Sequence, residues 1–377
     1  MSEKVLAATQ TGPRKVELRE YPMPEVSADN ALLKIEIAGI CGSDIGGYEH
    51  FEGAPRIRGH ENVGFLAKIG DTAAKRWGVK EGDRVVVEQY LPCGNCRWCR
   101  VGEYRFCDQT DKLPGRTILR YGNTPVSVAP SLWGGFSQYL YLPPNAILHK
   151  IPAHVPAAQA ALFVPLANGM QWAYLQGGAA PGKTVVIQGP GQMGLASVVA
   201  AREAGSPCII VSGLTKDERR FEVARKLGAH HTINVESESL SARVRDITNG
   251  QGADVVINVS RGGKETVRDA LDCAAKISTI VLAGPGDQQV PTRGFGRKLI
   301  TMKWVQGSSF AAFELGLQVM ASGRYALGEI STHQFDLSHV NEAIRAFAGE
   351  AGPPGVIHVS IRPEVEKVSS LEFSVSG

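Results

Sequence analysis

Residues 185–194 read Val-Val-Ile-Gln-Gly-Pro-Gly-Gln-Met-Gly, an apolar run followed by three glycines at the spacing G-x-G-x-x-G. The apolar run predicts a buried strand, and residues 193–204 predict a helix directly after it. Gly189 would allow a tight turn, Gly191 would let the backbone approach a pyrophosphate, and Gly194 would let the helix pack closely on the strand. Amides at the start of the helix would bind the phosphates. A bare G-x-G-x-x-G also occurs in ordinary glycine-rich turns, but this setting predicts a dinucleotide site.

Strands and helices alternate on the C-terminal side of this turn. The expected strands cover residues 208–212, 232–235, 254–259, 278–283 and 301–306. The expected helices cover residues 217–227, 240–249 and 264–275. Such alternation is typical of a parallel sheet covered by helices on both faces, so we expect an α/β, doubly wound Rossmann domain. Residues 156–178, before the turn, are rich in alanine and predict a helix that Pro165 kinks.

The choice between NAD and NADP depends on the end of the second strand, where an acid usually binds the ribose hydroxyls. Residues 208–212 are followed by Gly213, and no acid stands there. Lys216, Arg219 and Arg220 could bind a 2′-phosphate, whereas Asp217 could reach back to the ribose. These charges could also belong to a solvated helix start. We expect NAD, with NADP as the alternative. The candidate cofactor-binding residues are Gly189, Pro190, Gly191, Gln192, Met193, Gly194, Ser212, Gly213, Lys216, Arg219, Ala283 and Gly284.

Four of the seven cysteines crowd into one stretch with the spacing C-x2-C-x2-C-x7-C, namely Cys93, Cys96, Cys99 and Cys107. Two-residue gaps suit thiolates that converge on one zinc ion, and they make a poor disulfide framework. A site closed by four thiolates has no open position for a substrate, so we expect a structural zinc. Catalysis would then belong to another site, for which Cys41 and His60 are the candidates, with Ser43, Asp44 and Glu61 beside them.

These stretches together resemble the zinc-containing medium-chain dehydrogenases and reductases, which include alcohol, polyol and threonine dehydrogenases. The resemblance covers residues from about 5 to 362 and is carried by C-G-S-D at 41–44, G-H-E-N-V-G at 59–64, G-D-R-V at 82–85, the four cysteines and the glycine turn. It implies a GroES-like, β-rich catalytic domain made of residues 1–152 and 326–377, with a zinc lobe at about 90–110. It implies a Rossmann domain over 153–325.

The resemblance also implies roles for individual residues. Cys41 and His60 would bind a catalytic zinc, Ser43 would relay the substrate proton, and Asp44 would support the site. Glu61 can bind zinc in some relatives, and Asn168 matches a position that touches the nicotinamide.

Two positions depart from the family pattern. Val164 stands where relatives have a third metal ligand, and a valine cannot bind metal. The site would then use Cys41, His60 and Glu61, bind zinc weakly, or bind none. Relatives often have a proton-passing histidine after C-G-S-D, but here Ile45-Gly46-Gly47 stand there, and His50 is not aligned with it.

The leading hypothesis is therefore a zinc-dependent oxidoreductase that moves hydride between a nicotinamide cofactor and an alcohol or carbonyl compound. Tyr48, Phe51, Trp133 and Phe163 could give the pocket an apolar wall, which would suit a hydrophobic or aromatic substrate. One alternative is a reductase of carbonyls or activated double bonds that needs no catalytic zinc. A second is a non-catalytic dinucleotide-binding protein.

Composition limits the partners and the location. Net charge is only +3 over 377 residues, which argues against nucleic acid as a partner. No apolar run is long enough to span a bilayer, and the start lacks a signal-peptide pattern, so we expect a cytoplasmic protein without a membrane partner. The family suggests a homodimer or homotetramer that pairs through residues 301–306.

Overall fold

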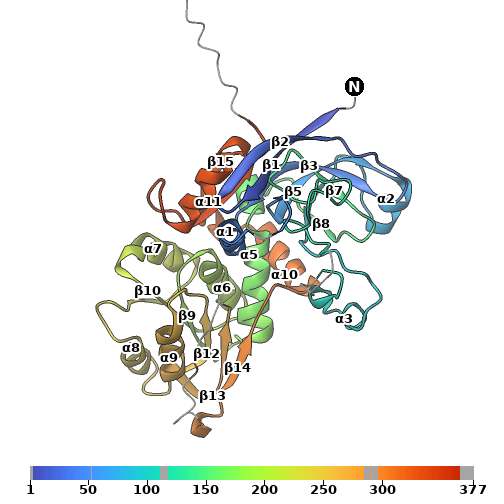
Figure 1. The fold of residues 1–377 in the computed structure, drawn as a ribbon. Coiled ribbons are helices and arrows are strands. Elements are labelled where there is room, and N and C mark those ends of the chain that lie inside the picture. The colour runs from blue at the N-terminus through green and yellow to red at the C-terminus, as the bar shows by residue number, and fades with distance from the viewer. Residues whose placement is uncertain (1–2, 52, 111–117, 284–289, 291–295, 366–377) are drawn as a thin grey trace, which may run out of the picture.

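The structure is a computed structural model that describes residues 3–51, 53–110, 118–283, 290 and 296–365. Figure 1 shows two lobes, one holding the yellow and orange strands of the middle of the chain and one holding the blue and red strands of its two ends. Helix α5 (Phe163–Gly169) and helix α10 (Phe310–Ala321) lie between them.

The middle of the chain forms a six-stranded sheet in which every neighbouring pair is parallel. The order is β11-β10-β9-β12-β13-β14, so the strand before the glycine turn lies at the centre. The strands are β9 (Thr184–Gln188), β10 (Cys208–Gly213), β11 (His231–Asn234), β12 (Ala253–Asn258), β13 (Ala274–Leu282) and β14 (Thr301–Trp304). Val185, Val186 and Ile187 are fully buried because helices cover both faces of the sheet. This is the Rossmann arrangement that the sequence predicts.

The helices of this lobe follow its strands in alternation. They are α6 (Gln192–Glu203), α7 (Glu218–Leu227), α8 (Leu240–Ile247) and α9 (Gly263–Cys273). Helix α7 ends at Gly228, whose φ of 112° is open to glycine but strained for other residues. The predicted bounds differ from these by one or two residues.

The predicted kinked helix before the turn differs in detail. It consists of α4 (Ala157–Ala160), α5 and a π-helical stretch, Met170–Gln176. Pro165 lies in the first turn of α5, where a backbone N–H has no partner within the helix, so the proline fits there without a kink.

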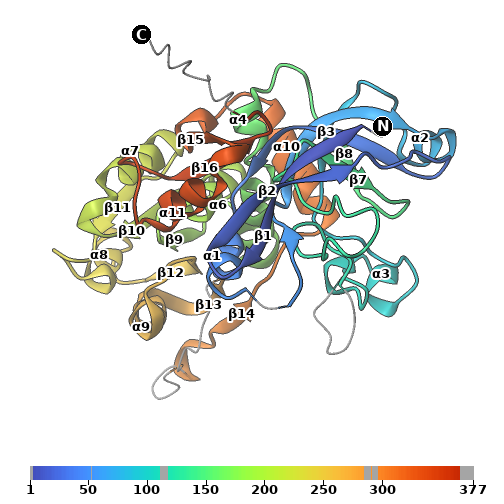
Figure 2. The ribbon, with the colours of Figure 1, turned by 45° about the horizontal axis from the view of Figure 1, so that its top comes forward.

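The two ends of the chain share a second sheet. Its strands are β3 (Ala31–Gly39), β5 (Glu61–Ile69), β6 (Arg84–Val87), β7 (Tyr139–Leu142), β8 (Leu148–Lys150), β15 (Ser331–Asp336) and β16 (His358–Arg362). Strand β16 pairs antiparallel with β3, with Ser360 opposite Gly39 (Figure 2). A smaller sheet holds β1 (Lys4–Gly12), β2 (Lys15–Pro22) and β4 (Arg56–Ile57). This return of the chain is what a catalytic domain made of both ends requires; its exact boundaries stay a prediction.

The remaining helices are short. They are α1 (Gly42–Glu49), α2 (Asp71–Trp77), α3 (Arg97–Arg100) and α11 (Val340–Ala348), with 3-10 turns at Tyr104–Phe106, Thr215–Asp217, Gly296–Lys298, Leu327–Glu329 and Leu337–His339. Among the described residues, no helix combines the length and the apolar character needed to cross a membrane.

Candidate functional site

Cys41, His60 and Glu61 come together through the pairing of β3 with β5. Gly39 at the end of β3 lies opposite Glu61 at the start of β5. Cys41, two residues after Gly39, is the N-cap residue of α1. The sulfur, nitrogen and carboxylate oxygen that these residues offer lie within 4.8 Å of one another. One sheet register thus brings three possible metal ligands to one point.

Asp44 holds two of these residues in place. Its carboxylate accepts a hydrogen bond from the backbone N–H of Cys41 at 3.0 Å and faces Nδ1 of His60 at 3.5 Å. Burial alone would lower the pKa of His60, but the charge of Asp44 outweighs burial and holds that pKa well above its ordinary value. With Nδ1 turned to Asp44, Nε2 is the nitrogen that remains for a metal, the usual arrangement for a metal-binding histidine.

The carboxylate of Glu61 is fully buried and receives no hydrogen bond from an N–H or O–H group of the described residues. Burial raises the pKa of Glu61 to about 8 in the metal-free protein. A buried carboxylate without donors, beside a thiol and an imidazole, fits a bound cation such as zinc. The donor set therefore suits the metal that the sequence predicts here, with Glu61 supplying the third ligand.

His358 on β16 is a neighbour of this site that the sequence reasoning missed. Its Nε2 lies 3.8 Å from Oε2 of Glu61, and both ring nitrogens are buried without partners among the described residues. Burial lowers the pKa of His358 to about 3, so the ring is neutral. No local pattern could have pointed to it, because only the pairing of β16 with β3 brings it near Glu61.

The two remaining positions in question are Val164 and Ser43. Val164 is buried in α5 within the apolar core and offers no ligand atom. Ser43, in the first turn of α1, is exposed beside Cys41. Its hydroxyl is thus free to meet a substrate oxygen.

The four cysteines of the predicted structural zinc site also converge, with sulfur atoms within 4.8 Å of one another. Backbone N–H groups of Asn95 and Cys96 point at the sulfur of Cys93, at 3.5 and 3.3 Å. Such amide donors stabilise thiolates, and the backbone amide of Cys99 is the main cause that lowers the pKa of Cys96 to about 6. Four thiolates in this arrangement fit a closed tetrahedral zinc site.

The glycine turn has the geometry that its sequence predicts. Gly189 has a φ of 99°, and a Cβ there would lie 3.1 Å from the backbone of Ser260. A Cβ on Gly194 would collide with the carbonyl oxygen of Gly189. Gly191 precedes α6 with open space around it, which leaves room for a phosphate.

The sequence has no acid directly after β10 to bind the ribose, but the carboxylate of Asp217 lies close to Gly213, the last residue of that strand. This carboxylate accepts a hydrogen bond from the N–H of Leu214 at 3.0 Å, and a Cβ on Gly213 would lie 3.0 Å from it. It also pairs with Arg220 at 3.0 Å. A longer turn after β10 thus returns a carboxylate to the end of the strand, beside Pro190.

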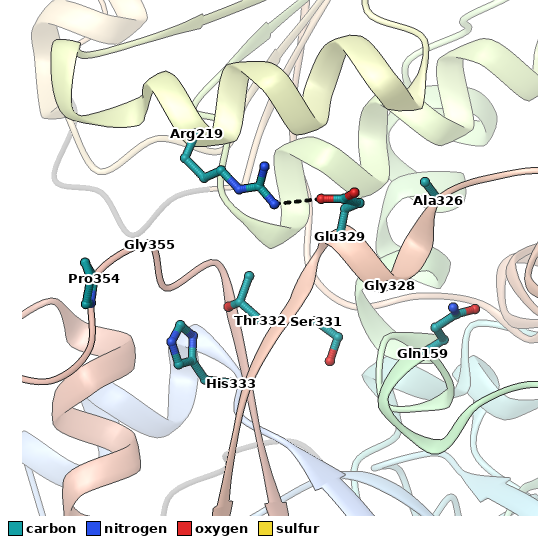
Figure 3. A pocket seen from close by; sticks show the side chains of 10 residues that line it. All are labelled: Gln159, Arg219, Ala326, Gly328, Glu329, Ser331, Thr332, His333, Pro354 and Gly355. Carbon is teal, nitrogen blue, oxygen red and sulfur yellow. Dashed lines mark hydrogen bonds and ion pairs between the residues drawn. The ribbon is translucent and has the colours of Figure 1, made fainter.

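Arg219 does not face the turn. Its guanidinium pairs with Glu222 at 3.1 Å and with Glu329 at 2.7 Å, on the wall of a cavity of about 620 Å³ (Figure 3). The predicted 2′-phosphate role of Arg219 is therefore not supported, because two carboxylates already compensate its charge. Lys216 is exposed at the turn.

At the nicotinamide end, Asn168 accepts a hydrogen bond from the hydroxyl of Ser308 at 2.6 Å, and its amide lies 3.6 Å from the sulfur of Met193. Gln192 donates to the carbonyl oxygen of Ile40 at 3.4 Å, which joins the two lobes next to Cys41. The described cofactor candidates Ser212 and Ala283 lie at the carboxyl ends of β10 and β13. Gly284 lies outside the described residues.

Three of the four aromatic residues expected to line the substrate pocket belong to the core, and the fourth, Phe51, lies against the guanidinium of Arg56. Tyr48, Trp133 and Phe163 are buried in three separate apolar cores. The Tyr48 hydroxyl donates to the carbonyl of Arg14, and the Trp133 indole donates to the carbonyl of Val128. These contacts account for the residues as core, so they give no support for a hydrophobic substrate.

Comparison with known proteins gives matches over most of the chain. Residues 27–153 match the profile of the alcohol dehydrogenase GroES-like domain, and residues 193–322 match that of the zinc-binding dehydrogenases. A probable alcohol dehydrogenase of Mycobacterium tuberculosis is 32% identical over 367 residues, which is 95% of this chain and 98% of the relative. An erythritol/L-threitol dehydrogenase of Mycolicibacterium smegmatis is 30% identical, covering 91% and 94%. The solved alcohol dehydrogenase TADH from Thermus sp. ATN1 superposes with a TM-score of 0.80 at 26% identity, covering 95% and 99%.

Proposed function

The chain belongs to the zinc-binding alcohol dehydrogenase family, and on that premise we propose that it oxidises an alcohol, or reduces the matching carbonyl compound, at Cys41, His60 and Glu61 with NAD as hydride carrier. The observation that supports this most directly is the convergence of these three ligand atoms within 4.8 Å. Their chemistry is that of a catalytic zinc site, which keeps a fourth position for the substrate.

Zinc bound by Cys41, His60 and Glu61 would lower the proton affinity of a substrate hydroxyl. Asp44 would keep His60 in the orientation that presents Nε2, and the exposed Ser43 hydroxyl would take up the substrate proton at Oγ. Asn168, fixed by Ser308, would position the nicotinamide. Bound at the glycine turn, a nicotinamide cofactor would supply the hydride chemistry.

NAD is the cofactor that Asp217 favours. A carboxylate beside Gly213 would accept hydrogen bonds from the two ribose hydroxyls, whereas it would repel a 2′-phosphate. Arg219, the cation that would have favoured NADP, is already paired.

The proposal can be tested by metal analysis of the intact protein and of substituted variants. Purified protein should hold two zinc ions per chain, and Glu61→Gln should hold one and lose turnover with every alcohol. Glu238→Gln, an exposed carboxylate paired with Arg243, is the control and should change neither. One zinc per chain in the unsubstituted protein, with full activity in Glu61→Gln and Cys41→Ala, would instead indicate the zinc-independent reductase. No turnover of either cofactor over a broad panel would indicate a non-catalytic protein.

We further propose that the protein is a cytoplasmic homodimer, or a homotetramer built from two dimers, that pairs through β14. This strand is the edge of the sheet, and its Trp304 is 61% exposed, with Leu299 at 70% and Phe310 at 47% nearby. An edge strand with an exposed tryptophan, flanked in sequence by two more exposed apolar residues, suits pairing with a second copy. Sedimentation should give a dimer or larger for the intact protein and a smaller species for Trp304→Asp; a monomer for both would contradict the proposal.

A further inference from the structure

Arg120 lies in a polar cluster on the edge of the proposed active site. A backbone bridge joins Tyr90 to Arg120, and the guanidinium of Arg120 sits 4.8 Å from the centre of the Tyr90 ring. Its Nε and Nη2 donate to Oε1 of Gln89 at 3.1 and 2.6 Å. The ring and the amide thus fix the guanidinium in one orientation.

The segment that carries Arg120 packs directly on the metal-binding strand. A Cβ on Gly122, two residues later, would lie 3.3 Å from the carbonyl oxygen of Gly59 and 3.4 Å from Cβ of His60. The segment that carries Arg120 therefore lies beside His60, one of the three proposed metal ligands.

Two polar atoms of this cluster form no hydrogen bond with the described residues, namely Nη1 of Arg120 and the hydroxyl oxygen of Tyr90. No carboxylate of that part of the chain lies within 4.0 Å of the Arg120 guanidinium, and its Nη1 donates no hydrogen bond there. The hydroxyl of Tyr90 is fully buried and also unpaired. The Tyr90 hydroxyl lies against Gly307, since a Cβ on Gly307 would collide with it. The next residue, Ser308, donates a hydrogen bond to Asn168.

Gly122 thus ties the Arg120 segment to His60, and Gly307 ties Tyr90 to the Ser308 and Asn168 end of the site. A half-buried guanidinium without a counter-charge is poorly solvated, so it gains from an anion. A buried tyrosine hydroxyl without a partner gains from an acceptor.

We propose that the substrate alcohol carries an anionic group, a carboxylate or a phosphate, that Arg120 binds while the reacting hydroxyl lies at Cys41, His60 and Glu61. This inference rests on the proposed function. The anionic group takes no part in the chemistry: the carbinol carbon loses hydride to the nicotinamide, the hydroxyl loses its proton, and the charge at Arg120 stays unchanged.

Matched substrate pairs test the inference. The pairs are 3-hydroxybutanoate with its methyl ester and glycerol phosphate with glycerol, and kcat/KM is measured for each with the zinc-loaded enzyme. The intact enzyme should prefer the charged member of at least one pair, and the pair with the larger preference identifies carboxylate or phosphate as the anion. Arg120→Gln should lower kcat/KM for that charged member by about 10- to 100-fold, the range of a hydrogen bond to a charged group, and change the neutral member less than about twofold.

Two further variants separate recognition from general charge and from folding. Arg120→Lys keeps a point charge without the guanidinium fork, so it should keep part of the preference. Arg268→Gln removes one exposed positive charge from α9 and should leave both members of each pair unchanged. A preference for the neutral members, or an equal loss for both members in Arg120→Gln, would overturn the inference.

Binding of malonate, followed by calorimetry, gives a readout that needs no turnover. It should bind the intact protein and bind Arg120→Gln at least about tenfold more weakly. If no alcohol is turned over but malonate binding depends on Arg120, the anion site stands and the proposed function fails. If malonate binds both proteins equally, the anion site fails whatever the activity.

Discussion

Replacing Asp217 by asparagine should weaken NAD binding and improve NADP binding. Asparagine has the same shape, and its side-chain oxygen can still accept the hydrogen bond from the N–H of Leu214 that the carboxylate accepts at 3.0 Å. The turn after β10 therefore keeps its conformation, while the negative charge beside Gly213 is lost. The substitution removes the negative charge and, with it, the ion pair to Arg220, which leaves Arg220 available to a 2′-phosphate.

The size of the effect follows from the bonds that the carboxylate would make. A hydrogen bond to a charged group contributes about 1.5–3 kcal/mol. A loss of about 2 kcal/mol in the pairing with the ribose hydroxyls corresponds to about a 30-fold weaker affinity for NAD, since about 1.4 kcal/mol is tenfold. Removing the charge also removes its repulsion of a 2′-phosphate, so the NAD/NADP ratio should fall by more than the loss in NAD affinity alone.

Equilibrium binding of NADH and NADPH, followed by the fluorescence of the reduced nicotinamide, measures both changes without a substrate. Glu218→Gln is the matched control, because Glu218 is the next residue and its side chain is 70% exposed in a pair with Arg225. Thermal unfolding of both variants checks that the fold is kept. An unchanged NADH affinity in Asp217→Asn, together with unimproved NADPH binding, would refute the assignment of Asp217 to the ribose.

Three other predictions address the metal, the turn and pH. Cys96→Ser should remove one of two zinc ions and lower the unfolding temperature, as measured by metal analysis and calorimetry; two retained zinc ions would contradict the four-thiolate site. Gly194→Ala should weaken NADH binding at least about tenfold and destabilise the protein by roughly 1–3 kcal/mol, because its Cβ collides with the Gly189 carbonyl; unchanged binding would mean that α6 can shift freely. Burial lowers the pKa of His149, but Glu88 and Glu314 outweigh burial and raise it, so its contribution to stability is present below about pH 6.5 and is lost as pH rises through the folded-state pKa. Urea midpoints measured from pH 6 to 9 should fall for the intact protein and fall less for His149→Gln; equal slopes would exclude His149.

Much of the fold could be predicted because its signals are local. The apolar run at 185–188 and the glycines after it predict a strand, a turn and a helix, because the steric requirements of adjacent residues decide the conformation there. The four cysteines likewise lie within one short loop. In such segments the residues that must meet are already neighbours in sequence.

The parts that could not be predicted depend on contacts between distant segments. Whether Pro165 kinks a helix depends on where that helix begins, which packing against α10 and α6 decides. The sequence does not show whether the aromatic residues Trp133 and Phe163 line a pocket or belong to the core, because that depends on which residues surround them. His358 and Arg120 reach the site only through strand pairing, so no spacing in the sequence could reveal them.

The pairing of β16 with β3 sets an order of events during synthesis. The parallel sheet built from Thr184–Gln188 to Thr301–Trp304 can form as soon as its own strands leave the ribosome, because its strands pair only with one another. Strands β3, β5, β6 and β8 of the sheet around the metal ligands can also pair early, which brings Cys41, His60 and Glu61 together. The edge of β3 at Ala38 and Gly39 instead waits for His358–Arg362, more than 300 residues after Cys41. The growing chain therefore exposes this edge until synthesis is nearly finished, and His358 reaches Glu61 only after the nucleotide-binding half has folded.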